Sequence, residues 1–398
     1  IIMNTSVSMA EVWTSEVEPW DEITEQPSWQ PVAEDLATTI SHNITETSTL
    51  PYFWEYKLSL DVQAYVGIFI VLFGLVGNVL VISVLVNKGR INSTSVYLIN
   101  LAASDLTICV IGQLCRVFPR ALTGIDTGSL NPWWCKSWFF INHSAKTISA
   151  WTLVAVTIER CLVVYFPLKT QTFCKTSSAK IASVFINILC AVWYIHYFWS
   201  YGALYEIVDG QRVVVAGCTV LKDVPALKTY MAEVRPMQDF VVRSAAPFVV
   251  LLVCNVLIIY RLMRQQAKRS DLAGGETKDK DNSQIRSVTV MLLTVSFAHL
   301  ICISPMQIMY LIDKSDPFGW EMRYRWQALV ALRWSFAIDI YYANHAINFI
   351  LYCISGRDFR ENLKNLLVKI PVIKACFSSP PKAAQSQSAS VETVDAKV

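Results

Sequence analysis

Long apolar segments alternate with short polar ones along most of the chain. A helix rises about 1.5 Å per residue, so about 20 mostly apolar residues are needed to cross the roughly 30 Å hydrocarbon core of a membrane. Seven segments meet this condition, and they are residues 62–86, 93–115, 133–158, 181–205, 240–260, 287–312 and 334–354. Because backbone polar groups in lipid must be paired within the spanning element, we predict that these segments are helices rather than strands.

The segments predict an all-α membrane protein, a bundle of seven transmembrane helices over residues 61–355. Buried helices of a large soluble protein are a weaker explanation, because seven segments reach this length. The composition agrees, since 54% of the 398 residues are hydrophobic and 16% are charged, whereas soluble domains are roughly 45–50% apolar and about 25% charged. A net charge of +3 gives no indication of nucleic-acid binding, and the eleven cysteines lack the C-x-x-C spacing of a zinc module.

The distribution of charge predicts how the chain is oriented. Basic residues concentrate between helices 1 and 2, 3 and 4, and 5 and 6, and after helix 7. Cytoplasmic loops carry an excess of Lys and Arg, so these segments are predicted to be cytoplasmic. The first sixty residues instead contain ten acidic residues and one basic residue. We therefore expect a multi-pass plasma-membrane protein with an extracellular N-terminus and a cytoplasmic C-terminus.

The two ends of the chain differ in composition from the apolar part. The first sixty residues are polar and acidic, and we expect them to be disordered, with glycans on Asn4 and Asn43 in Asn-x-Ser/Thr sequences. Residues 356–370 alternate basic and apolar positions at helical spacing, which is typical of a short amphipathic eighth helix lying on the membrane. Residues 371–398 are predicted to form a flexible cytoplasmic tail, in which Cys376 is a candidate for palmitoylation.

Asp105 is an acidic residue in the middle of the second predicted helix. An ionisable group at that depth costs roughly 2.5–3.5 kcal/mol unless polar groups surround it, so it needs partners within the bundle. The polar residues of neighbouring helices that are candidates for this network are Asn78, Ser149, Asn344 and Asn348. Two interpretations are open: a buried hydrogen-bond network, or a ring of acceptors that holds a sodium ion with water.

Short motifs follow one another in a fixed order along the apolar segments. They are Gly77-Asn78-Val79, the run Leu101–Leu106 around Asp105, Glu159-Arg160-Cys161, Pro247, Cys302-Ile303-Ser304-Pro305 and Asn348-Phe349-Ile350-Leu351-Tyr352. In this order they resemble the signature regions of rhodopsin-like (class A) G-protein-coupled receptors, and the chain most resembles invertebrate neuropeptide receptors. The resemblance covers about residues 60–370.

The resemblance implies a cell-surface receptor that transmits the binding of an extracellular neuropeptide to heterotrimeric G proteins. It implies no enzymatic activity and no cofactor other than an allosteric sodium ion at Asp105, and it adds arrestin, a receptor kinase and membrane lipid as partners. The residues that it assigns to the G-protein switch are Glu159, Arg160, Asn348 and Tyr352. The alternatives are a receptor of this class for a lipid or small chemosensory ligand, a transporter or channel, and, for Arg160 alone, a side chain that extends toward lipid phosphate.

The resemblance also implies a disulfide bond. Cys135 lies 25 residues before Arg160, as in that family, and would lie at the extracellular end of the third helix. Cys218 lies in the long extracellular loop 202–238. Both cysteines are predicted to face an oxidising compartment, so we expect them to be bonded and to hold the loop over the mouth of the bundle. The loop segment 211–219 resembles the short hairpin that caps peptide receptors.

Residues spaced three or four apart on the third helix predict one wall of a ligand pocket, and they are Trp138, Asn142 and Lys146. Asn142 stands where receptors for biogenic amines have Asp, which argues against an amine ligand. Residues 315–363 contain no Lys, so helix 7 offers no amine for a retinal Schiff base.

The charged residues of helices 5 and 7 predict the remaining walls of this pocket. Asp239 and Arg243 are one turn apart on helix 5, and Asp339 lies on helix 7. With Lys146 they are expected to form a polar pocket for a peptide. The alternative is that Lys146 and Asp339 neutralise each other and have a purely structural role.

Five positions depart from the usual pattern of the family. Ile303 stands in place of a Trp in helix 6, and His299 in place of an aromatic residue four positions earlier. Phe349 replaces the proline of helix 7, Asn187 replaces a Trp in helix 4, and Asn255 replaces a Tyr in helix 5. These changes leave the predicted fold intact and bear on the details of signalling.

Overall fold

The computed structural model describes residues 52–89, 91–123, 127–169, 174–208, 211–221, 229–270, 279–312 and 320–368. Contacts divide the chain into the units Ile1–Leu50 and Pro51–Val398, and the description below concerns the second unit alone. The predicted glycan acceptors Asn4 and Asn43, the candidate palmitoylation site Cys376 and the tail 371–398 lie outside the described residues.

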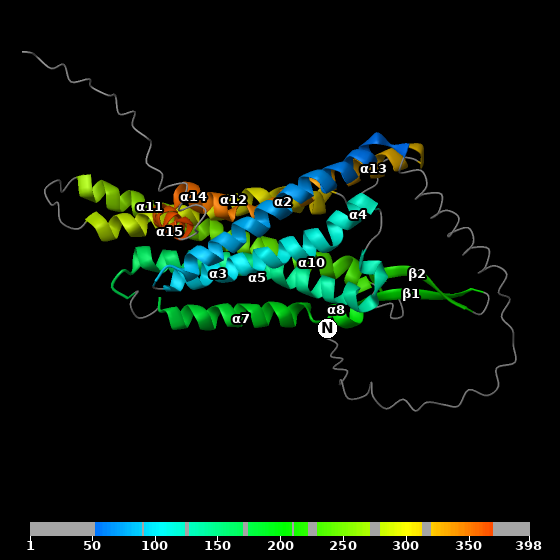
Figure 1. Cartoon of the computed structure of the whole chain (residues 1–398), viewed down its shortest axis with the longest axis horizontal. Helices are drawn as coiled ribbons and strands as arrows, with labels where there is room; N and C mark the ends of the chain where they lie inside the picture. The colour runs from blue at the N-terminus through cyan, green and yellow to red at the C-terminus, as the bar shows by residue number, and fades with distance from the viewer. Residues whose placement is uncertain are drawn as a thin grey trace, which may run out of the picture. The chain divides into compact units, whose positions relative to one another are not determined.

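Six helical segments of the described ranges are long and apolar enough to cross a membrane (Figure 1). The first and third are single α-helices, α2 (Trp54–Val86) and α5 (Pro132–Tyr165), and the sixth lies within α12 (Asp279–Ile312). The other three are composite. The second consists of α3 (Ser93–Thr107), η2 (Ile108–Val117) and α4 (Phe118–Thr123), and the fourth of α7 (Thr176–Tyr194) and α8 (Tyr197–Ser200). The fifth consists of α10 (Arg235–Phe240), η5 (Val241–Ala245) and α11 (Ala246–Ser270).

The seventh predicted segment, 334–354, is divided at Ile347 between α13 (Trp320–Ala346) and α14 (Asn348–Ser355). It is not among the six that reach the length and hydropathy of a membrane span. The reason is its polar content, since α13 includes Arg333, Asp339, Asn344 and His345. The helix nevertheless packs along α2 and α12, as expected of the last helix in the bundle.

The first helix begins at Trp54, within the segment 1–60 that composition predicts to be disordered. This beginning of α2 is held against α13, because the buried carboxylate of Glu55 accepts a hydrogen bond of 3.2 Å from Nε of Arg325. The contact pairs residues 270 positions apart in the sequence, so the pattern of the first segment alone gives no sign of it.

Asparagine side chains fix the starts of two transmembrane helices. Asn92 caps α3, its side-chain oxygen accepting from the backbone N–H of Ser95 at 2.8 Å. Asn131 caps α5 in the same way by accepting from the N–H of Trp133 at 2.8 Å, and Pro132 follows in the first turn, where no N–H is required.

Two segments of the bundle are π-helical rather than α-helical. The second helix changes to the π-helix η2 directly after Thr107, and the fifth helix contains η5 after Phe240. Such insertions rotate the following side chains and are common at functional sites. Here they place the buried residues Gln113, Arg116 and Arg243 in the interior.

The loop before the fifth helix contains an antiparallel hairpin of β1 (Tyr201–Val208) and β2 (Gln211–Val220). Tyr201 pairs with Val220, and a bulge interrupts the register between Gly202 and Tyr205. The short π-helix η4 (Tyr230–Val234) leads on to α10. The hairpin lies at one end of the bundle and α15 (Arg357–Leu367) lies at the other; we call these the hairpin end and the α15 end (Figure 1).

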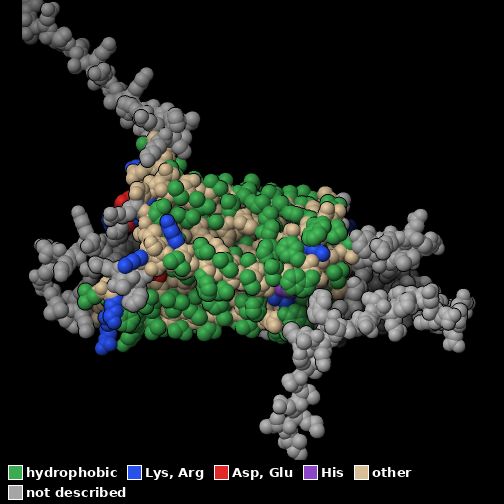
Figure 2. All heavy atoms as spheres, turned by 90° about the horizontal axis from the view of Figure 1, so that it is seen from below, with side chains coloured by type: hydrophobic (Ala, Val, Ile, Leu, Met, Phe, Trp, Pro, Cys, Tyr) green, Lys and Arg blue, Asp and Glu red, His purple; other side chains and the backbone are tan. Residues whose placement is uncertain are grey.

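The interior and the surface of the bundle are both apolar, as expected in lipid. The main core packs buried side chains of eight of the described helices against one another, among them Val81, Leu98, Leu153, Leu251, Leu292 and Tyr352. Large apolar side chains also cover the outside, and Figure 2 shows them as a broad green belt; Phe69, Ile181 and Val256 are 61%, 71% and 55% exposed. Lys and Arg side chains gather toward the α15 end of that belt.

Candidate functional site

Asp105 is the centre of a hydrogen-bond network deep in the bundle, and both of its carboxylate oxygens are paired. Its side chain is completely buried. Oδ1 accepts from Oγ of Ser149 on α5 and from Nδ1 of His345 on α13, each at 2.7 Å. Oδ2 accepts from Nδ2 of Asn348 on α14, also at 2.7 Å. One carboxylate thus joins the second, third and seventh helices.

Two residues predicted to contact Asp105 have other partners. Asn78 donates to the carbonyl oxygens of Gly74 and His345, each at 2.9 Å, and therefore ties α2 to α13. Asn344 faces α12, where its Nδ2 lies 3.1 Å from Nδ1 of His299. Ser149 and Asn348 are the two predicted partners that do contact Asp105.

His345 is the partner of Asp105 that the sequence prediction missed. The sequence did contain a signal for this contact: His345 lies three residues before Asn348, a predicted partner of Asp105, so both side chains share one face of a helix. The backbone breaks only mildly between them: Ile347 has helical dihedral angles, and its N–H still bonds to the carbonyl of Ala343 at 3.0 Å. The shared face is therefore preserved across the boundary between α13 and α14.

The predicted switch residues Glu159 and Arg160 form a compact cluster at the α15 end of α5. Oε1 of Glu159 lies 2.7 Å from Nη2 of Arg160, and it accepts a hydrogen bond of 3.0 Å from Oγ1 of Thr94. The same Thr94 oxygen also accepts from Arg160. Both charged residues are buried. Through these two hydrogen bonds, Thr94 attaches the pair to the start of α3.

Tyr352, the fourth predicted switch residue, lies one helical turn beyond Asn348 and is almost fully buried. Its ring lies 5.6 Å, centroid to centroid, from that of Phe359 on α15. The aromatic contact connects the end of the seventh helix to the short amphipathic helix. Tyr352 thus lies between the Asp105 network and the surface helix rather than against Arg160.

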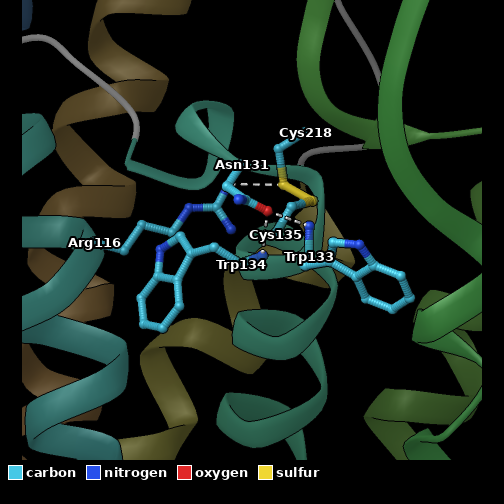
Figure 3. The surroundings of a disulfide bond; sticks show 6 residues. All are labelled: Arg116, Asn131, Trp133, Trp134, Cys135 and Cys218. Carbon is cyan, nitrogen blue, oxygen red and sulfur yellow. Dashed lines mark hydrogen bonds between the residues drawn. A yellow bond between two sulfur atoms is a disulfide. The ribbon is translucent and has the colours of Figure 1, made fainter.

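The hairpin is fastened to the bundle by a disulfide between Cys135 and Cys218, as predicted (Figure 3). Cys135 lies in the first turn of α5, directly after the cap Asn131, and Cys218 lies in β2. Nη2 of Arg116 points at the bridge from the second helix, 3.7 Å from Sγ of Cys218. The guanidinium group of Arg116 also lies over the ring of Trp138, 4.1 Å from its centroid.

Lys146 faces the seventh helix, as the predicted pocket requires. Its Nζ lies 3.3 Å from the hydroxyl of Tyr342, and 5.0 and 4.7 Å from the ring centroids of Tyr341 and Tyr342. Asn142, one turn away on α5, is buried, and its Oδ1 has no hydrogen-bond partner. This wall combines one cation with aromatic rings and an unused acceptor.

Asp239 belongs to a second polar cluster, between α5, α7 and α10. Its Oδ1 accepts from the hydroxyl of Tyr194 at 3.0 Å and lies 3.1 Å from Nη2 of Arg235. Its Oδ2 lies 3.8 Å from Nδ1 of His143. Arg243 reaches the same histidine, with 3.2 Å between Nη1 and Nδ1. Asp239 and Arg243 are therefore bridged through His143, which the sequence prediction omitted together with Tyr194 and Arg235.

Asp339 is buried but is not joined to either cluster. Neither of its carboxylate oxygens makes a hydrogen bond of good geometry, although the side-chain amide of Gln113 interacts with it, and the described residues show no ion pair between it and Lys146. The predicted alternative, in which Lys146 and Asp339 neutralise each other, is thus wrong for this structure, because the ammonium group turns to Tyr342. The amide of Gln113, which interacts with Asp339, is fully buried in η2.

The residues that depart from the usual pattern are accommodated locally. Asn187 exchanges amide hydrogen bonds of 3.1 and 3.3 Å with Asn100, which pairs α7 with α3. Ile303 is buried in the core, and His299 is paired with Asn344. Asn255 is fully buried, and neither side-chain amide atom has a hydrogen-bond partner. Phe349 packs against the main core.

Comparison with protein families decides what kind of bundle this is. Residues 77–352 match the family described as 7 transmembrane receptor (rhodopsin family). The chain belongs to this family. The matched region extends into α14, so it includes α13 as the seventh helix of the receptor. Membership confirms the predicted all-α membrane fold and agrees with the prediction that the chain is a receptor rather than an enzyme.

Three relatives are similar to the receptor along most of their length. Galanin receptor 2a of Danio rerio is 24% identical over 316 residues, which are 78% of this chain and 79% of the relative. The galanin-like G-protein coupled receptor npr-9 of Caenorhabditis elegans is 24% identical over 342 residues, 81% and 78% of the two chains. Galanin receptor 2b of Danio rerio is 25% identical over 336 residues, 84% and 80% of the two chains.

Proposed function

We propose that this receptor binds a neuropeptide at its hairpin end and activates a heterotrimeric G protein at its α15 end. The observation that carries the proposal is the concentration of buried polar and charged side chains below the disulfide-tethered hairpin, including Lys146, Asp239 and Arg243. A peptide supplies backbone amides and charged groups that satisfy such side chains, whereas a lipid ligand requires an apolar lining. The names of the three similar receptors support the same ligand class.

Orientation follows from the same proposal. Basic side chains gather toward the α15 end, which favours the cytoplasmic side for that end and the extracellular side for the hairpin. The plasma membrane is then the site of action. The amphipathic helix α15 lies at the level of the inner leaflet, and the tail beyond it is the substrate proposed for a receptor kinase and the docking segment for arrestin.

The cluster around Arg160 supplies a physical basis for coupling. The guanidinium group is held by Glu159 and Thr94 in a buried, charge-assisted cluster. A partner helix that offers backbone or side-chain acceptors to Arg160 would replace those contacts, so binding of the G protein and opening of this cluster are coupled equilibria. Ligand binding at the hairpin end would shift that equilibrium through the carboxylate of Asp105, which joins three helices between the two ends.

The direct test is a screen for a peptide agonist. The full chain is expressed with a promiscuous G protein, and a library of amidated neuropeptides that includes galanin is tested for calcium release. A saturable response, absent from cells that express Arg160→Ala at equal surface density, is the expected result. Silence of the library at verified surface expression, together with responses to lipids or small odorants, would refute the neuropeptide proposal.

A further inference from the structure

The carboxylate of Asp105 stands where sequence reasoning allowed a sodium ion, and the structure permits that fit to be tested. A hard cation is bound by oxygen lone pairs from several ligands. Around Asp105 the oxygen atoms instead face hydrogen-bond donors: a hydroxyl, an amide N–H₂ and an imidazole nitrogen, each 2.7 Å away. These donors occupy the directions from which a cation would approach the carboxylate.

His345 is held firmly in that position. Its backbone carbonyl accepts from Nδ2 of Asn78 at 2.9 Å, which fixes the helix that carries it. Its ring packs edge-on against Tyr341, with 5.3 Å between the centroids, and its Nδ1 lies 3.4 Å from Oγ of Ser149. The side chain is 1% exposed, so protein encloses the ring, and among the described residues its Nε2 makes no hydrogen bond that would draw the ring away from Asp105.

We infer that His345 replaces the cation at Asp105, so that this receptor is insensitive to sodium. The imidazole nitrogen supplies the donor that the carboxylate requires, from the helix opposite, and its ring fills the space in which an ion and its water would lie. The inference concerns the stability of the receptor itself and does not depend on which ligand it binds. His345 is thus the residue that determines whether the Asp105 site is ionic or closed.

Removing the ring should create the site that it blocks. In His345→Ser, Asp105 loses one donor, while a hydroxyl oxygen and the vacated volume become available to a hydrated cation. In His345→Asn the amide retains a donor, so the variant should remain insensitive. His299→Ser is the matched control, because His299 is also a buried histidine of the interior but bonds to Asn344 rather than to Asp105.

The experiment measures the thermal unfolding midpoint, Tm, of the purified full-length receptor in sodium chloride and in choline chloride at equal ionic strength. The expected result is no difference for the wild type, His345→Asn or His299→Ser, and a saturable rise of about 2 °C in sodium for His345→Ser. That rise should disappear in the double variant His345→Ser/Asp105→Asn.

Two results would overturn the inference. One is a saturable rise in Tm of the wild type with sodium that is lost in Asp105→Asn, since it would show that the ion binds despite His345. The other is a folded His345→Ser variant with no response to sodium. If His345→Ser fails to fold, the inference is still tested by measuring whether sodium raises the Tm of the wild type, Asp105→Asn and His345→Asn.

Discussion

The buried carboxylate of Asp105 in the middle of the bundle and that of Asp339 toward the hairpin end differ in how they are paired. In the middle, both oxygens of Asp105 are paired, and the described contacts close into a network across three helices. Toward the hairpin end, Asp339, Gln113 and Asn142 are equally buried but retain unpaired atoms. Leaving such groups unpaired costs free energy that the polar groups of a bound ligand can offset. The paired carboxylate of Asp105 is suited to holding one conformation, and the less fully paired groups near the hairpin are suited to receiving a ligand.

The largest effect is expected from removing the centre of the closed network. Asp105→Ala leaves the donors of Ser149, His345 and Asn348 buried without an acceptor, and we expect it to destabilise the receptor by about 3–5 kcal/mol. The measurement is the thermal unfolding midpoint in detergent, with exposed Asp61→Ala as the control. Equal midpoints for the wild type and Asp105→Ala would show that the network contributes nothing to stability.

The disulfide should come next, because it ties the hairpin to the open end. Cys218→Ala releases the hairpin from Cys135 and should cost about 2–4 kcal/mol and most of the peptide affinity. Surface expression and binding of the peptide agonist are measured together, with the free cysteine Cys115→Ala as the control. Normal binding by Cys218→Ala would mean that the tether does not shape the ligand site.

A smaller effect is expected from Thr94, whose hydroxyl attaches the Glu159–Arg160 pair to α3. Thr94→Val keeps the shape of the side chain but removes that hydroxyl, which is worth about 1.5 kcal/mol in a hydrogen bond to a charged group. Ligand-independent signalling should therefore rise by roughly tenfold. Thr107→Val, which removes an exposed hydroxyl further along the second helix, is the control. Unchanged basal signalling in Thr94→Val would show that the hydrogen bonds of Thr94 to Glu159 and Arg160 do not control G-protein activation.

The smallest effect on stability, and of the opposite sign, is expected at Asp339. Asp339→Asn removes a buried charge that has no ion-pair partner among the described residues and keeps the shape of the side chain, so the receptor should be as stable as the wild type or more so by about 1 kcal/mol. Peptide potency should nevertheless fall, because the carboxylate is available to the ligand. A loss of stability as large as that of Asp105→Ala would show that the two regions do not differ.

The difference between the two regions also determined what could be predicted from the sequence. The apolar segments gave the helices, and the isolated acid at Asp105 identified the closed network with two of its partners, Ser149 and Asn348. His345 was recoverable from its three-residue spacing to Asn348. The contact between Glu55 and Arg325 was not recoverable, because neither residue's local pattern depends on the other.

The pocket at the hairpin end was predicted less completely than the network. Lys146, Asp239 and Arg243 are buried, but their partners were not predicted. In the fifth helix, the π-helical turn that contains Arg243 changes which side chains face inward. Periodicity assumes a regular α-helix, so it cannot assign partners beyond such a turn. Lys146 and Tyr342 lie in the regular α-helices α5 and α13, where periodicity predicts the face of each residue but not its partner on the other helix.

The central claim is that ligand binding and G-protein activation reside in different regions of this bundle. The most direct measurement compares Arg160→Ala and Asp339→Asn for agonist binding and for G-protein activation at equal surface density. The account predicts that Arg160→Ala binds the peptide normally and activates no G protein, whereas Asp339→Asn binds it more weakly and still reaches full activation at saturating peptide. Full activation by Arg160→Ala, or unchanged binding by Asp339→Asn, would contradict it.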